Sequence, residues 1–138
     1  MFPVVENVAQ FESAVKLVDE VAADLGINVG DHFELGVMIE TSILVDGELA
    51  ELARHPRADF FSLGTNDLFQ SVTGISRQYS AGNICKELDH RMIAALKKAC
   101  EIVLPSNKPL SVCGGMGNNW RGLLVLLTLG IRQISLDP

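Results

Sequence analysis

The chain has 138 residues, is 48% hydrophobic and carries a formal net charge of −6 at pH 7. This length is sufficient for one domain with a hydrophobic core, and the hydrophobic content excludes an intrinsically disordered chain. The acidic pI of about 4.9 disfavours nucleic-acid binding, which depends on clustered Lys and Arg.

The predicted strands and helices alternate along the chain. Strands are predicted at residues 2–5, 35–40 and 60–63, after the turn at residues 105–109, and at residues 133–136. Helices are predicted at residues 8–25 and 43–53. A further segment begins as a helix at residue 68 and becomes a loop around Gly74 and Gly82. The last two predicted helices run from the N-cap Asp89 to residue 104 and from an N-cap at Asn118 or Asn119 to residue 129. Short strands separated by helices are typical of a parallel sheet. A single α/β domain over residues 1–138 is therefore expected.

The number of strands limits the fold further. A closed (β/α)₈ barrel needs eight strands and roughly 250 residues, whereas five strands are predicted here. The fold is therefore either a smaller open α/β sheet or part of a barrel.

Targeting and thiol chemistry favour a cytoplasmic protein. No apolar run approaches the roughly 20 residues of a membrane helix, and the first six residues lack the basic region of a signal peptide. The cysteines Cys85, Cys100 and Cys113 fit no zinc pattern, and an odd number argues against a disulfide framework. Neither a membrane nor a nucleic acid is expected as a partner.

Compact polar residues stand where three of the predicted strands end. Glu40 closes the second strand, residues 64–67 (Gly-Thr-Asn-Asp) follow the third, and Cys113 ends the fourth before two glycines. The carboxyl ends of parallel strands lie at one edge of a sheet, where ligands bind. We therefore predict that these residues share one rim.

The same residues carry a family resemblance. The chain resembles the phosphoenolpyruvate (PEP)-binding barrel of the PEP-utilising enzymes, a group that includes enzyme I of the bacterial phosphotransferase system, PEP synthase and pyruvate phosphate dikinase. Enzyme I is the most similar of the three. The matching stretches are Met1-Phe2-Pro3, residues 36–41, residues 59–70, Arg77, residues 112–114 and residues 134–136.

The resemblance implies a fold, an activity and a set of roles. The fold would be the C-terminal part of a (β/α)₈ TIM barrel, and the function would be that of the PEP- and Mg²⁺-binding domain of a PEP-protein phosphotransferase, with Mn²⁺ as a possible substitute. Glu40 and Asp67 would hold the metal, and Cys113 would protonate the enolate as pyruvate forms. The substrate would be bound by Gly64, Thr65, Asn66 and Arg77.

Several residues depart from the family pattern. Ser42 stands where the family usually has Pro, and Gly115 stands where it usually has an acid. Two further PEP-binding arginines and the phosphohistidine domain belong to parts of the family's proteins that this sequence does not contain. The isolated chain is therefore expected to turn PEP over slowly or not at all. A phosphocarrier protein would be reached only through other domains.

The sequence also allows other interpretations of the chain's function and of single residues. The chain could be a non-catalytic interaction or oligomerisation module, or a lyase-type barrel that acts on pyruvate or oxaloacetate. Residues 66–67 could form only a turn and a helix cap, Arg77 could be a surface charge, and Cys113 could be a small buried hydrophobe. A homodimer is also expected, since an open sheet has unpaired edges, with contacts at residues 2–5 and 134–136.

Overall fold

The computed structural model of the chain describes residues 1–76 and 89–136, without the side chains of residues 31 and 32. Its strands are β1 (Gly36–Ile39), β2 (Phe60–Gly64), β3 (Leu110–Cys113) and β4 (Gln133–Ile134). Its α-helices are α1 (Val8–Asp24), α2 (Val29–His32), α3 (Ser42–Asp46), α4 (Leu49–Arg54), α5 (Thr65–Thr73), α6 (His90–Val103) and α7 (Trp120–Thr128). Two 3₁₀ helices, η3 (Leu104–Ser106) and η4 (Gly115–Asn118), flank β3.

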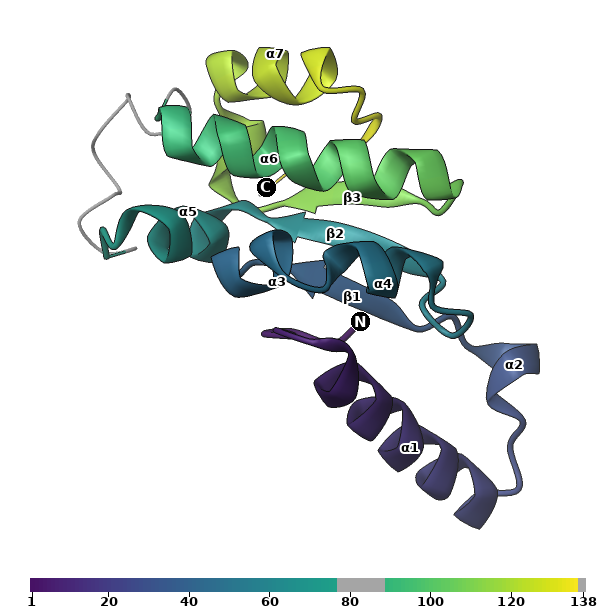
Figure 1. Cartoon of the computed structure of the whole chain (residues 1–138). Coiled ribbons are helices and arrows are strands. Elements are labelled where there is room, and N and C mark those ends of the chain that lie inside the picture. The colour runs from purple at the N-terminus through teal and green to yellow at the C-terminus, as the bar shows by residue number, and fades with distance from the viewer. Residues whose placement is uncertain (77–88, 137–138) are drawn as a thin grey trace.

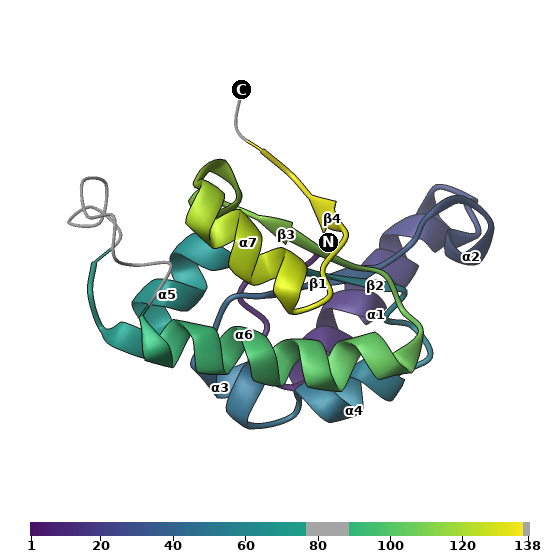
Figure 2. The same cartoon turned by 90° about the horizontal axis from the view of Figure 1, so that it is seen from above.

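The four strands form one parallel sheet in the order β1-β2-β3-β4. Helices α3, α4 and α6 lie along one face of this sheet, with α7 on the β4 side and α1 on the β1 side (Figures 1 and 2). Each strand is joined to the next through at least one helix, which is the connection that parallel strands require. The expected α/β fold with a parallel sheet is therefore confirmed.

The expected number of five strands is wrong for the described residues, because the first predicted strand is only an isolated bridge. Phe2 pairs with Val37, and its backbone exchanges hydrogen bonds with Gly36 and Met38 at 2.8 and 2.9 Å. The pairing stops there because Val4, the next residue that could extend it, adopts a left-handed φ of 51° and donates its N–H to the Glu40 side chain. Tertiary contacts thus override the apolar pattern of residues 2–5.

The two faces of the sheet differ in polarity. Val37, Phe61 and Leu63 are fully buried, and they alternate with residues that point to the opposite face. On that opposite face Met38, Ser62 and Ser111 stand opposite one another in the register. This second face thus carries two serines together with Met38 and Phe60, and the parallel sheet is consistent with part of a barrel.

Most helix boundaries follow local sequence rules. Asp89 caps α6 and Asn119 caps α7, each accepting a hydrogen bond of 2.9 Å from the backbone two residues on. The helix expected at residues 43–53 is instead two helices, α3 and α4, separated at Gly47, where a Cβ would stand only 2.8 Å from the Ile43 carbonyl oxygen. The short helix α2 was not expected. Within residues 1–76 and 89–136, no helix has both the length and the hydropathy to cross a membrane.

Candidate functional site at the strand ends

The carboxyl ends of β1, β2 and β3 lie side by side (Figure 1). Glu40 directly follows β1, and Gly64 at the end of β2 pairs with Cys113 at the end of β3. We call Glu40, residues 64–67 and residues 113–115 the rim. The structure thus brings the predicted strand ends together, whereas the chemical roles of their residues stay predictions.

Glu40 is the buried carboxylate of the rim, with 5% of its surface exposed. Its Oε1 accepts a hydrogen bond of 2.6 Å from the backbone N–H of Val4. Its Oε2 lies against Gly64, where a Cβ would approach within 2.9 Å. Glu40 has no ion-pair partner among the described residues. Because a buried charge without a partner is costly, this carboxylate is well suited to a cation.

Two side-chain hydrogen bonds join the end of β2 to the end of β3. The Thr65 hydroxyl donates to the Cys113 carbonyl oxygen at 2.9 Å, and the Gly115 N–H donates to Asn66 Oδ1 at 3.2 Å. Thr65 is 3% exposed, so its bond is protected from water. The structure places the N-cap of α5 at Gly64, so Asn66 is not a helix cap; instead it holds the two strand ends together.

Gly114 is required at its position for two reasons. Its φ of 95° is open mainly to glycine, and a Cβ there would stand 2.7 Å from Thr65 Oγ1 and 3.2 Å from Asn66 Nδ2. The close approach of this backbone lets the Thr65 and Asn66 side chains reach β3. The first of the two glycines after Cys113 is therefore explained by packing at the rim.

The two described cysteines have different environments. Cys113 is partly buried at the rim, and its thiol contacts the Leu63 carbonyl oxygen at 3.7 Å. Cys100 lies in the core on α6, as predicted, and burial raises the pKa of its thiol to about 11. A thiol with such a pKa is inert at neutral pH, so Cys113 is the better candidate for chemistry of these two.

The rim offers oxygen ligands of the kind that Mg²⁺ prefers. Asp67 is partly buried in the first turn of α5, where the helix dipole favours a negative charge. No cluster of three or more His, Cys, Asp or Glu that could hold a metal occurs in the described part of the chain. Mg²⁺ is usually bound through only one or two carboxylates together with waters and substrate oxygens. The pair of Glu40 and Asp67 therefore fits Mg²⁺ by its donor chemistry.

One predicted site residue falls on a segment outside the described residues. Arg77, proposed to contact the phosphate, lies outside the described residues, as does Cys85. The sequence did not predict one contact at the rim, the hydrogen bond that the backbone N–H of Val4 donates to the Glu40 carboxylate. Only Pro3, which interrupts the first apolar run, hinted that the chain leaves the sheet at this point.

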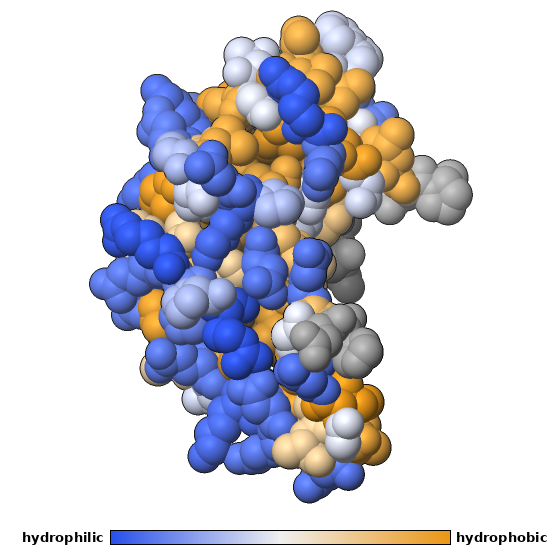
Figure 3. All heavy atoms as spheres, turned by 90° about the vertical axis from the view of Figure 1, so that its right-hand side faces the viewer, coloured by the Kyte–Doolittle hydropathy of each residue, from blue (hydrophilic) through white to orange (hydrophobic). Residues whose placement is uncertain are grey.

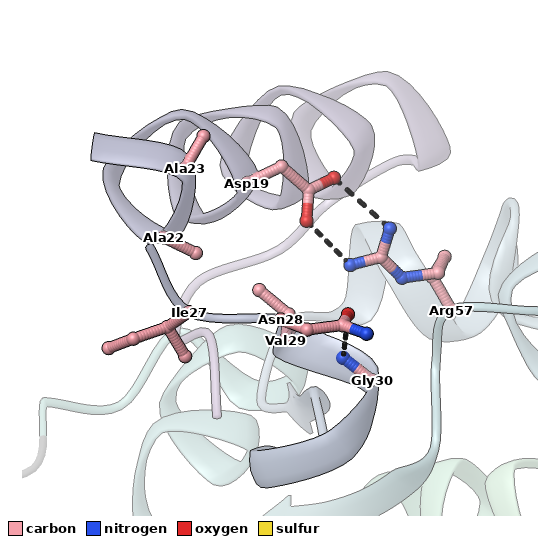
Figure 4. Close-up of a pocket in the computed structure, with 8 residues that line it drawn as sticks. All are labelled: Asp19, Ala22, Ala23, Ile27, Asn28, Val29, Gly30 and Arg57. Atoms are coloured by element: carbon pink, nitrogen blue, oxygen red, sulfur yellow. Dashed lines mark hydrogen bonds and ion pairs between the residues drawn. The ribbon is translucent and has the colours of Figure 1, made fainter. Parts of the chain in front are cut away.

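A second concave feature lies away from the rim. A depression of about 430 Å³ is found between the end of α1 and the start of α2 (Figure 4). Asp19 and Arg57 cross it as an ion pair, with oxygen–nitrogen distances of 2.8 and 3.1 Å. These hydrogen bonds from Arg57 lower the pKa of the Asp19 carboxyl. Because the guanidinium is already engaged by Asp19, we place the candidate site at the rim.

Comparison with known families identifies the family of the chain. A family model described as "PEP-utilising enzyme, PEP-binding domain" matches residues 1–138, the whole chain. The chain belongs to this family. The family expected from the sequence is thus confirmed.

Individual relatives are considerably longer than the chain. The chain is 31% identical to the phosphoenolpyruvate-protein phosphotransferase of Staphylococcus carnosus over 99% of its length, which is 24% of the relative. It is 29% identical to the protein of the same name from Borreliella burgdorferi, covering 24% of that protein. It is 32% identical to the multiphosphoryl transfer protein of Xanthomonas campestris, covering 16% of it. The chain thus spans a quarter or less of these relatives.

Proposed function

We propose that the rim binds PEP together with a divalent cation, Mg²⁺ or Mn²⁺, as part of a phosphotransferase similar to enzyme I. The buried Glu40 carboxylate carries this proposal. It stands at a strand end, it has one oxygen that accepts no hydrogen bond among the described residues, and it has no cation partner there. Membership of a PEP-binding domain family supplies the substrate.

We propose a different role in binding for each of the described rim residues. Glu40 and Asp67 would hold the cation, which would spread the negative charge of the phosphoryl group when bound. The Oδ1 of Asn66 is occupied by Gly115, so its amide nitrogen is left to donate to a phosphate or carboxylate oxygen. Arg77 would add positive charge from the segment outside the described residues.

Cys113 would supply a proton. After the phosphoryl group leaves, the enolate of pyruvate needs a proton on its methylene carbon, and a positioned thiol can donate it. The Cys113 thiol is held near the Leu63 carbonyl oxygen, on the same face of the sheet as Ser111. It would therefore approach the substrate from that face of the sheet.

The phosphoryl acceptor is proposed to lie outside residues 1–138. Because relatives named phosphoenolpyruvate-protein phosphotransferase are about four times longer, we propose that other segments supply the accepting histidine and the phosphocarrier partner. The chain by itself is proposed to bind PEP and the cation, with little turnover.

An interaction role is the second candidate, and one surface favours it. Trp120, Leu124 and Leu127 are exposed at helical spacing on α7. The space-filling view shows apolar surface gathered at the end of the molecule that carries α7 (Figure 3). Apolar stripes of this kind often mark contacts between proteins. Self-association through this face is compatible with the binding role and would not replace it.

Thermal unfolding with and without divalent cation tests the proposal. A ligand that binds only the folded chain stabilises it in proportion to the logarithm of its concentration. We expect millimolar Mn²⁺ to raise Tm relative to chelator, and PEP to raise it further only when Mn²⁺ is present. Equal melting temperatures under all conditions would favour the interaction module, and stabilisation by pyruvate or oxaloacetate but not PEP would favour a lyase-type barrel.

A further inference from the structure

The backbone at Val4 is unusual for its residue type. Val4 has a φ of 51°, a left-handed conformation that is a genuine outlier for a β-branched residue. Such strain persists only where the surrounding structure enforces it, and it is concentrated at functional positions. The contacts of Val4 therefore need an explanation.

The neighbours of Val4 on both sides are fixed to the domain. Phe2 is held by two backbone hydrogen bonds to β1, and Val5 is buried in the core. The side chain of Val4 itself is 62% exposed, so core packing does not account for the strained backbone. At this turn the backbone N–H of Val4 donates to Oε1 of Glu40 at 2.6 Å, while the chain continues to the buried Val5.

We infer that Val4 is a positioning residue for the metal ligand Glu40, acting through its backbone N–H. This inference rests on the proposed function of the rim. The bond to Oε1 fixes the rotation of the carboxylate and leaves Oε2, which lies against Gly64, for the cation. Hydrogen bonds to ligating carboxylates orient them, and losing such a bond typically weakens metal affinity by about 10- to 100-fold.

The chain contains a matched control for this contact. The backbone N–H of Val8 donates to Oε2 of Glu48 at 2.7 Å. This bond also ties the N-terminal segment to a glutamate side chain, but Glu48 precedes α4 and is not part of the rim. Proline at Val8 would remove the bond with little strain, because position 8 is the first residue of α1.

The test compares Mn²⁺ affinity by electron paramagnetic resonance in the native chain and three variants. Val4→Gly keeps the N–H and tolerates the left-handed backbone, so its dissociation constant should stay within about twofold. Val4→Pro removes the N–H and also excludes the φ of 51°, and it should raise the constant about tenfold or more. Val8→Pro should leave it within about twofold of native. Equal constants for Val4→Pro and Val8→Pro would overturn the inference.

If Val4→Pro does not fold, NMR and hydrogen exchange of the Val4 amide in the native chain test the positioning role. In the native chain the Val4 amide proton should be shifted downfield, protected from exchange in the presence of Mg²⁺, and moved upfield by Glu40→Gln. A Val4 amide that exchanges as fast as an exposed loop amide would contradict the inference. A native chain that binds no Mn²⁺ while its Val4 amide remains protected would instead overturn the proposed function, and with it the positioning role.

Discussion

Gly64 lies directly against Glu40, since a Cβ at position 64 would stand 2.9 Å from the Glu40 Oε2 and 3.0 Å from its Cβ. The φ of Gly64 is −85°, a value that any residue adopts, so backbone freedom does not account for this glycine. Its role is to leave space for the carboxylate. The end of β2 and the residue after β1 are therefore fitted to each other.

Gly64→Ala should disturb the cation site through this contact. The added methyl would push the Glu40 carboxylate away and lower the free energy of unfolding by about 1–3 kcal/mol, as overpacking does. Gly26→Ala is the control, because a Cβ there meets nothing within 4 Å and only its φ of 68° is strained. Urea unfolding should show a loss of about 1–2 kcal/mol for the control, with Mn²⁺ affinity weakened only in Gly64→Ala. Unchanged affinity in Gly64→Ala would mean that this contact does not shape the site.

Thr65→Val should destabilise the rim without changing its shape. The substitution removes the hydroxyl that donates to the Cys113 carbonyl oxygen in a buried position. An unmade buried hydrogen bond costs about 1–3 kcal/mol, which chemical denaturation would detect. Thr128→Val removes a similar bond to Leu124 on an exposed helix face and should change stability by no more than about 0.5 kcal/mol. Equal losses of stability in the two variants would show that the hydrogen bond between β2 and β3 contributes no more than one on an exposed helix face.

The sequence predicts the rim better than the N-terminal segment, for physical reasons. Strands that stop at compact polar residues place those residues at one edge of a parallel sheet, whatever the rest of the fold does. Glu40, Asn66 and Cys113 follow this rule. Val4 could not be predicted, because its left-handed backbone results from tertiary contacts on both sides of it. No propensity rule places a β-branched residue in that conformation.

Some helix boundaries have local causes that the sequence reveals, whereas others depend on tertiary contacts. Asp89 and Asn119 cap helices through their own side chains, so the sequence alone reveals them. The break at Gly47 is harder to predict, because an apolar stripe continues on both sides of it. There Gly47 leaves the helical region, with φ −104° and ψ −106°, and a Cβ would stand only 2.8 Å from the Ile43 carbonyl oxygen.

Acid should weaken the contribution of Asp89 at the start of α6. Hydrogen bonds from the Arg91 side chain lower the pKa of the Asp89 carboxyl to about 2. A carboxyl whose folded pKa is depressed stabilises the fold above its unfolded pKa of about 3.9 and loses that contribution as the pH falls toward 2. The stability difference between native chain and Asp89→Asn should therefore shrink between pH 5 and pH 2. Because 43% of the Arg91 side chain is exposed, solvent screening should keep this stability difference small. A difference that is constant with pH would contradict the pairing.

Self-association is expected through apolar surface. Light scattering at micromolar concentration should report a mass near twice 15.0 kDa, because exposed apolar stripes and open sheet edges favour a second copy. The double substitution Trp120→Ser with Leu124→Ser should shift the mass toward the monomer, whereas Leu136→Ser tests the edge next to β4. If neither changes a dimeric mass, the contact lies elsewhere. A native chain that is monomeric throughout would refute the expectation.

The most direct test of the central claim is a calorimetric titration of Mg²⁺, followed by PEP, into the native chain, Glu40→Gln, Asp67→Asn and the control Glu51→Gln. Glu51 lies exposed on α4, so its variant should behave as the native chain does. We predict that the native chain and the control bind Mg²⁺ and then PEP. Each rim variant should lose at least about tenfold in Mg²⁺ affinity and bind PEP correspondingly less. Equal Mg²⁺ and PEP affinities for all four proteins would contradict a cation site at Glu40 and Asp67.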